Sequence, residues 1–213
     1  METEVVQAVA QHAEETLGKE GFRYISAVVA NSKMLALELE AQEDGDTGEV
    51  DMDALVIASY LHDISTTVHG YHDHHLKSAA MAAEFLRELD VPDEQVTKVE
   101  QIILAHTSAA PADGQQEGAV PLEARILYDA DKLGRLSGLA VVTSLIEFGA
   151  RYPNRAVTGE VLATILRHIE ERFVDLYQSL NTVPAREMAR EKFGNTLSFL
   201  DGVIEHLSDA TPV

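Results

Sequence analysis

Histidine and aspartate residues occur in this sequence in an order that could build a metal site. His62 and Asp63 close the apolar run of residues 54–61, and the later members of the series are His69, His72, His74, His75, His106, Asp129 and Asp131. Imidazole nitrogen and carboxylate oxygen are suitable ligands for Zn, Mn, Fe, Ni or Co. Because the chain has no cysteine, any metal ion must rest on nitrogen and oxygen ligands.

Helical periodicity predicts that His62 and His106 point inward. Leu55, Ala58 and His62 share one face of a helix predicted over residues 51–63, and Asp63 lies at its end. His106 continues the apolar stripe of a helix predicted over residues 93–107. A buried imidazole needs a polar partner or a metal ion. For either histidine taken alone, a hydrogen-bonded core residue is the alternative interpretation.

The local cluster of histidines precedes a helix predicted over residues 75–89. His74 or His75 lies in its first turn or just before it, and we favour His74 as the site residue. His69 and His72 are expected in the preceding loop. A histidine-rich tract indicates metal binding, although an exposed polar loop would have the same composition.

Two aspartates lie in the apolar pattern of a helix predicted over residues 121–149. Leu127 and Asp131 are i, i+4 neighbours, which favours Asp131 as the inward carboxylate. Asp129 is an alternative ligand, or a residue that supports the ligands. Lys132 and Arg135 could compensate phosphate charge, but for Arg135 a solvated helix face is favoured.

The chain is predicted to be all-α. Helices are expected near residues 2–17, 22–42, 51–63, 75–89, 93–107, 121–149, 158–180 and 184–208. Residues 42–48 are predicted to form an acidic surface loop, and residues 108–120 a long connection after His106 that could contact substrate. With 213 residues and no persuasive linker, one domain is expected.

Composition excludes several classes of partner. The formal net charge is -20, which argues against a broad nucleic-acid or anionic-membrane surface but not against one small phosphate-bearing substrate. No apolar stretch approaches the ~20 residues of a membrane helix, and no basic signal-like start is seen, so a cytoplasmic location is expected. The sequence carries no signal for an oligomeric state.

The ordered set His62-Asp63, His74, His106 and Asp131 resembles the HD superfamily of metal-dependent phosphohydrolases, which is named for the doublet. The resemblance covers most of the chain, including the segment Tyr128-Asp-Ala-Asp131-Lys-Leu, and the tail after Leu180 is similar to a bacterial uncharacterised-hydrolase branch. Some members of that branch hydrolyse nucleoside triphosphates to monophosphates. The resemblance implies one HD-type domain over residues 1–213, with an HD core at about 22–150 and C-terminal helices at about 155–208.

One position departs from the family pattern. The family places a metal-binding histidine in an earlier helix, followed by an apolar residue four positions on and a small residue eight positions on. Tyr24, Val28 and Ser32 occupy that register here. A protonated phenol, with an ordinary pKa of about 10, is a poor metal ligand.

The resemblance assigns roles to the remaining residues. It implies that His62, Asp63 and Asp131 hold a divalent ion (Mn, Mg, Fe, Ni, Co or Zn), with Asp129 as an alternative ligand. His74 and His106 would hold a second ion or bind substrate phosphate, and Lys132 would orient a phosphate oxygen. Catalytic roles are therefore expected for Asp63, His74, His106 and Lys132.

The function expected from this resemblance is hydrolysis of a phosphate ester or phosphoanhydride in a small molecule, with a nucleotide as the favoured substrate. Two other functions stay open. Tyr24 motivates a degenerate HD module that binds a nucleotide or a partner without catalysis. The histidine cluster also permits a di-iron oxygenase, because some relatives of the superfamily use paired iron.

Overall fold

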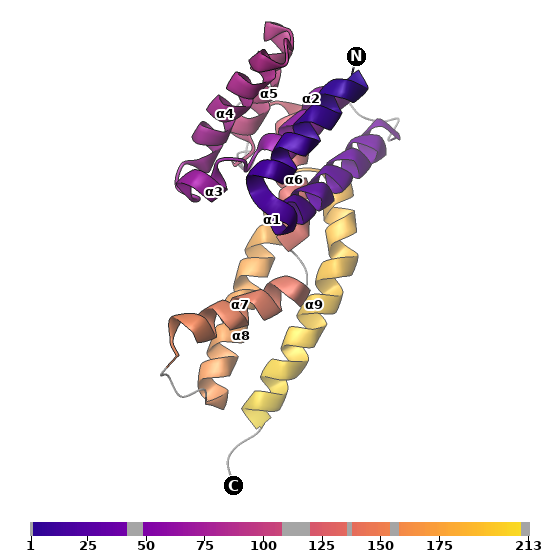
Figure 1. The fold of residues 1–213 in the computed structure, drawn as a ribbon. Coiled ribbons are helices and arrows are strands. Elements are labelled where there is room, and N and C mark those ends of the chain that lie inside the picture. The colour runs from indigo at the N-terminus through magenta and orange to yellow at the C-terminus, as the bar shows by residue number, and fades with distance from the viewer. Residues whose placement is uncertain (1, 42–48, 108–119, 136–137, 154–157, 210–213) are drawn as a thin grey trace. The chain divides into compact units, whose positions relative to one another are not determined.

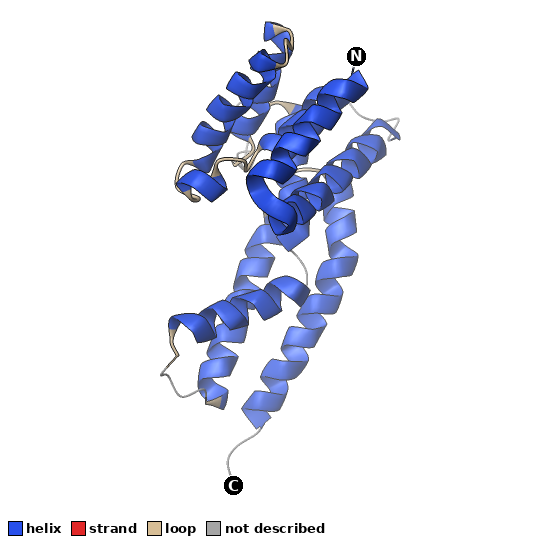
Figure 2. Ribbon diagram, viewed as in Figure 1, coloured by secondary structure: helices blue, strands red, loops and turns tan. Residues whose placement is uncertain are grey.

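The computed structural model describes residues 2–41, 49–107, 120–135, 138–153 and 158–209. Every regular element in these ranges is a helix, as Figure 2 shows, which confirms the predicted all-α fold class. No helix in these ranges has the length and apolar character needed to cross a lipid bilayer. The predicted loop at 42–48 and the predicted connection at 108–120, apart from its last residue, lie outside the described residues.

The chain divides into two compact units, and the prediction of one domain stays a prediction. Unit 1 comprises Met1–Gly134 and Asn181–Ala185, and unit 2 comprises Arg135–Leu180 and Arg186–Val213. The helices of unit 1 are α1 (Glu2–Ala41), α2 (Met52–Leu61), α3 (Thr66–His69), α4 (His74–Glu88), α5 (Asp93–Ala105) and α6 (Leu122–Arg135), whose last residue belongs to unit 2 (Figure 1). The helices of unit 2 are α7 (Gly138–Arg151), α8 (Gly159–Gln178) and α9 (Val183–Asp209). The first three residues of α9, Val183–Ala185, belong to unit 1.

Most predicted helices are found. The two helices predicted at 2–17 and 22–42 are both present within α1, where they meet at a kink: the backbone at Gly18, with φ at 70°, is not helical. The short helix α3 was not predicted, because four residues are too few for an apolar period. The helix predicted over 121–149 corresponds to α6 and α7, and its continuity stays a prediction because residues 136–137 lie outside the described residues.

Helix α2 is buried along nearly its whole length, because its sequence is a continuous apolar run. Seven of its ten residues are buried, from Ala54 to Leu61, and it packs against α1 and α5. Asp51 caps its N-terminus by accepting a hydrogen bond from the Ala54 N–H at 3.0 Å. The helix therefore enters the core with a fixed register and delivers His62 and Asp63 at its far end.

A charged network holds the start of α2 against α5 and α6. The Lys98 ammonium lies 2.9 Å from Asp51 and 3.4 Å from the buried Glu123 carboxylate, which accepts the Asp51 N–H at 3.0 Å. Burial opposes ionisation of Asp51, but the Ala54 N–H and the Lys98 ammonium outweigh it and lower the pKa of that carboxyl. Three helices that carry site residues are thus joined at one point.

Helix α6 is held to the start of α9 through Asp129. This carboxylate is fully buried and accepts hydrogen bonds from the backbone N–H groups of Asn181 and Thr182, both at 2.7 Å. It also accepts the Asn181 Nδ2 at 3.2 Å and the Thr182 hydroxyl at 2.7 Å. Burial raises the pKa of Asp129, and the four hydrogen bonds only partly offset that rise.

Loss of the Asp129 carboxylate should destabilise the protein severely. Asp129→Ala leaves two backbone donors without an acceptor in a buried place, at a cost of about 3–5 kcal/mol in the free energy of unfolding. Asp129→Asn keeps one acceptor oxygen, so its free energy of unfolding should lie between those of Asp129→Ala and the natural protein. Chemical denaturation measures both, and Asp201→Ala on an exposed face of α9 is the matched control, expected within about 0.5 kcal/mol. If Asp129→Ala and Asp201→Ala lowered the free energy of unfolding equally, Asp129 would not anchor the start of α9 to α6.

Candidate metal centre

His62, Asp63 and His106 form the core of the candidate site. One potential ligand atom from each lies within 4.8 Å of the others, and all three residues are buried. His62 is the C-cap residue of α2, and His106 is the C-cap residue of α5. Contact between α2 and α5 therefore brings together two helix ends that the sequence separates by more than forty residues.

The ring orientation of each histidine is fixed by a carbonyl three residues earlier. Nδ1 of His62 lies 2.9 Å from the Ser59 carbonyl, and Nδ1 of His106 lies 2.5 Å from that of Ile103. His74 repeats the arrangement with the Tyr71 carbonyl at 2.9 Å. Because a carbonyl can only accept, each Nδ1 must carry a proton, so the Nε2 atom of each ring is the one that can offer a lone pair to a ligand.

Two buried polar atoms at the centre have no hydrogen-bond partner. They are Nε2 of His62 and Oδ1 of Asp63. The other Asp63 oxygen lies 3.6 Å from His62 Nε2, which is too long for a hydrogen bond. A buried acceptor without a partner costs about 1–3 kcal/mol, and a cation between the imidazole and the carboxylate would satisfy both atoms. The donor set thus fits a divalent metal ion.

His74 lies at the edge of this core. It is the first residue of α4, as the sequence predicted for the first turn, and its Nε2 is 3.4 Å from Asp63 Oδ1. Its ring centroid is 5.6 Å from that of His106. The Ser65 hydroxyl donates to the His74 carbonyl at 3.1 Å and also accepts from the buried Ser78 hydroxyl at 2.9 Å, which fixes the start of α4 beside the turn after Asp63.

His106 is held neutral by its surroundings. Burial, together with the nearby His62 imidazole, lowers the pKa of His106 to about 3. A neutral imidazole is the form that binds a metal ion. The environment therefore prepares His106 as a ligand across the physiological pH range.

Asp131 is buried, but its carboxylate is engaged by other residues. Its Oδ1 accepts the Tyr24 hydroxyl at 2.5 Å, and its Oδ2 pairs with the Lys132 ammonium at 2.8 Å. The sequence singled out Tyr24 as a departure from the family pattern, but only the structure reveals this contact between residues 107 positions apart.

The other predicted residues lie apart from the core group. Asp129 is occupied by its bonds to Asn181 and Thr182. His72 is exposed in the turn before α4, as expected, whereas His69 is an exposed residue at the end of α3 and the prediction that it lies in a loop was wrong. Arg135 is exposed, as expected for a solvated helix face. The exposed Tyr71 was not predicted as a site residue. The centroid of its ring lies 6.2 Å from that of His74, and the two rings meet edge to face. The sequence could not predict this contact, because it depends on the course of the backbone between the two residues.

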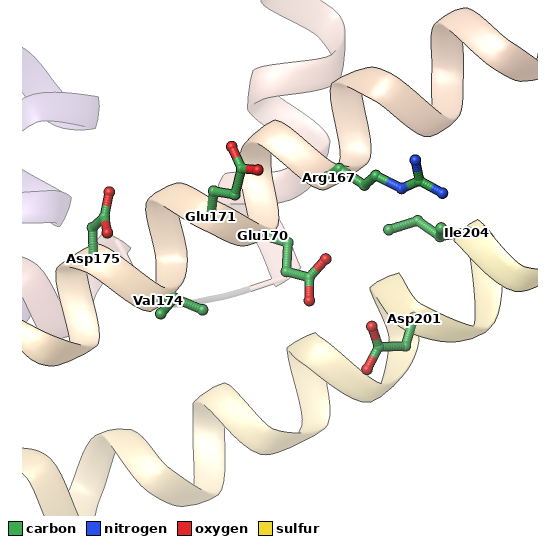
Figure 3. A pocket seen from close by; sticks show the side chains of 7 residues that line it. All are labelled: Arg167, Glu170, Glu171, Val174, Asp175, Asp201 and Ile204. Atoms are coloured by element: carbon green, nitrogen blue, oxygen red, sulfur yellow. The ribbon is translucent and has the colours of Figure 1, made fainter.

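A separate pocket of about 470 Å³ lies in unit 2 and contains none of the predicted site residues. Figure 3 shows its side chains on α8 and α9; they are Arg167, Glu170, Glu171, Val174, Asp175, Asp201 and Ile204. The set contains four carboxylates and one guanidinium, and this excess of negative charge disfavours binding of a phosphate.

Comparisons with known proteins identify a family and a shared fold. The HD domain family model matches residues 25–136, and no curated protein matches. An HD-superfamily hydrolase from Bacillus thuringiensis is 19% identical over 99% of this chain and 100% of that chain, with a TM-score of 0.68. Bacillus subtilis YpgQ in complex with ADP is 18% identical over 99% of this chain and 97% of that chain, with a TM-score of 0.70. The Lin1889 protein from Listeria innocua is 18% identical over 98% of each chain, with a TM-score of 0.69. These likenesses are at the level of the fold.

The low pKa of His106 predicts acid sensitivity of the metal-free protein. Between pH 6.5 and about 3 the unfolded chain takes up a proton at this position and the folded chain does not, so stability falls as pH falls through that range. At pH 4.5 this group alone should cost about 2–3 kcal/mol relative to pH 7.5. Denaturation with a chelator present at both pH values measures the loss. His106→Gln should lose less over the same interval, and an equal loss in both proteins would contradict the assignment.

Proposed function

Because this chain belongs to the HD domain family, we propose that it is a metal-dependent phosphohydrolase acting on a phosphate ester or phosphoanhydride, with a nucleotide as substrate. The observation that carries the proposal is the group of His62, Asp63 and His106, with buried ligand atoms that lack partners and with both Nε2 lone pairs available. These three residues would hold the ion. A divalent ion in such a site supplies Lewis acidity, which polarises a phosphoryl oxygen and makes water more acidic.

His74 is suited to receive the proton from the attacking water. Its side chain is 21% exposed, so water and substrate can reach it, and the contact of Nδ1 with the Tyr71 carbonyl orients the ring with Nε2 toward Asp63. When the O–H bond of the water breaks, the proton would move to His74 Nε2 and the oxygen would form the new bond to phosphorus. The P–O bond to the leaving group would break at the same centre, and the leaving oxygen would depart with the electron pair of that bond. The imidazolium so formed faces the Asp63 carboxylate at 3.4 Å, which stabilises its charge.

Lys132 supplies a positive charge for the phosphate. Its side chain is mostly buried, and its ammonium is held by Asp131 at 2.8 Å and by the Tyr128 ring, whose centroid is 4.8 Å away. Two fixed partners restrict the flexible side chain to one region. In a chain with a net charge of -20, this ammonium would supply a local positive charge that attracts a phosphate to the site.

Tyr71 supports a nucleotide as the substrate class. Its ring is 72% exposed beside His74, and an exposed aromatic face next to a phosphate site can stack on a nucleobase. The likeness to YpgQ, which was solved with ADP, points in the same direction. We therefore infer that the base lies toward Tyr71 while the phosphates lie toward Lys132 and the metal ligands.

The activity is tested by phosphate or pyrophosphate release from a panel of nucleotides with Mn, Mg, Co and Ni. We expect turnover that falls by about 100-fold or more in Asp63→Ala, because even residues that only support a ligand cost 10–100-fold. Metal analysis of each preparation shows whether the loss follows metal content. Turnover no higher than that of Asp63→Ala, with every metal and nucleotide, would contradict the proposal.

The substrate class is tested at Tyr71. Tyr71→Ala should raise the KM for a nucleotide by about 10-fold, since stacking of one base contributes about 1–3 kcal/mol, with little change in kcat. Tyr71→Phe keeps the ring and is the matched control. A phosphate ester without an aromatic ring should be hydrolysed equally by all three proteins. A similar KM increase for that ester in Tyr71→Ala would assign Tyr71 a structural role.

A non-catalytic HD module is the second candidate function, favoured by the Tyr24–Asp131 hydrogen bond in place of a ligand histidine. In that case Tyr24→His should recover metal binding or activity that the natural protein lacks. A natural protein that is already metal-loaded and active contradicts this candidate. The same metal analysis bears on the oxygenase hypothesis, which requires two irons per chain after aerobic purification.

A further inference from the structure

Two serines are buried where the turn after Asp63 meets the start of α4. Ser65 lies in that turn and Ser78 lies on α4, and both residues are 0% exposed. Serine is mostly found at protein surfaces, and a buried hydroxyl group without a hydrogen-bond partner is costly. The partners of these two hydroxyl groups therefore indicate what the serines hold in place.

The two serines form a set of three hydrogen bonds that ends on the backbone of His74. The Ser65 N–H donates to the Ser78 hydroxyl oxygen at 3.2 Å, and the Ser78 hydroxyl donates to the Ser65 hydroxyl oxygen at 2.9 Å. The Ser65 hydroxyl donates its own proton to the His74 carbonyl at 3.1 Å. Since a carbonyl can only accept, the proton of each hydroxyl has one assigned direction.

These bonds join the two segments that carry Asp63 and His74. The Asp63 carbonyl accepts the N–H of Thr66 at 3.0 Å and its hydroxyl at 2.7 Å, which ties the Asp63 backbone to the turn that contains Ser65. On the other side, the Tyr71 carbonyl orients the His74 ring. What remains to be fixed is the separation between the two backbones, and the serine pair spans it.

Packing of helices alone holds this junction weakly. Among the described helices, α4 packs chiefly against α5 and makes few contacts with α2 or α3. The buried serine pair is thus a direct polar link between the first turn of α4 and the turn that follows α2. Across this link, Nε2 of His74 lies 3.4 Å from Oδ1 of Asp63.

We propose that Ser65 and Ser78 are positioning residues for the proton transfer assigned to His74. Because both serines are fully buried, they act through the His74 backbone and do not touch the substrate. They hold the His74 imidazole at the distance from Asp63 at which the carboxylate stabilises the imidazolium. This inference rests on the role of His74 in the proposed function, and it assigns Ser65 and Ser78 to the chemical step.

The first test is the turnover of Ser78→Ala with the nucleotide and metal ion that the natural protein uses best. A displacement of about 1 Å can slow a reaction about 100-fold, so kcat should fall by about 10-fold or more. The KM should stay within about twofold, because the serine does not bind substrate. Ser65→Ala should behave alike, and the double variant should lose no more than about threefold further.

Thr196→Val on α9 is the matched control for the loss of a buried hydroxyl group. Thr196 is 7% exposed, and its hydroxyl donates to the Lys192 carbonyl at 3.0 Å, within the same helix. Its kcat should stay within about twofold of the natural value. Circular dichroism and a cooperative thermal transition establish that each variant is folded. A kcat for Ser78→Ala no lower than that of Thr196→Val overturns the inference.

A double-mutant cycle separates positioning of His74 from a general loss of stability. His74→Ala should lower kcat by about 100-fold or more, as expected for loss of a general base. In that background Ser78→Ala should lower kcat by less than about twofold, because no imidazole is left to misplace. The same factor in both backgrounds overturns the inference. Unchanged turnover in His74→Ala also overturns it, but leaves metal-dependent hydrolysis standing.

Crystal structures of the natural protein and of Ser78→Ala provide a readout that does not depend on turnover. We expect His74 Nε2 to move by about 1 Å or more relative to Asp63 in the variant. An unmoved His74 overturns the inference, even if the variant turns over slowly. If the natural protein hydrolyses no nucleotide, the phosphohydrolase proposal fails, and the displacement of His74 alone decides whether the serine pair positions it.

Discussion

The candidate centre depends on one repeated interaction, the bond from a histidine Nδ1–H to the carbonyl three residues earlier. His62 and His106 make this bond at helix C-termini, where backbone carbonyls lack partners within the helix. One hydrogen bond thus satisfies an end of the helix and fixes the tautomer and direction of the ring. Burial then keeps His106 neutral. Without this bond, a buried imidazole could point either nitrogen inward, and no defined ligand geometry would follow.

The surrounding helices serve to keep these ends in place. Asp51 fixes the start of α2, and the Lys98–Glu123 pair joins that start to α5 and α6. On α6, Asp129 and Asp131 are two residues apart and therefore point in different directions. Asp129 holds the start of α9, and Asp131 receives Tyr24 and Lys132. Two similar carboxylates thereby have different tasks, which are set by what faces each of them.

Much of the fold followed from the sequence, since apolar periodicity identified the helix ends that carry His62, His74 and His106. The boundary between the two units after Gly134 was not predicted, because the apolar pattern continues from α6 toward α7. The ligand assignment was harder to predict. Spacing identified Asp131 as an inward carboxylate, but an inward residue can face a metal ion, a phenol or an ammonium, and periodicity does not distinguish among these partners.

By itself the sequence determined the residue types, their order and the helices that carry them, and these were sufficient for the family. Helical periodicity is local, so one chain segment reveals which side of it faces the core. The tertiary structure decided which inward groups meet. It brought His62 and Asp63 to His106, and it brought Tyr24 to Asp131 across 107 positions of sequence. Such contacts depend on how helices pack against one another, and that packing is fixed by the complementary shape of the whole core.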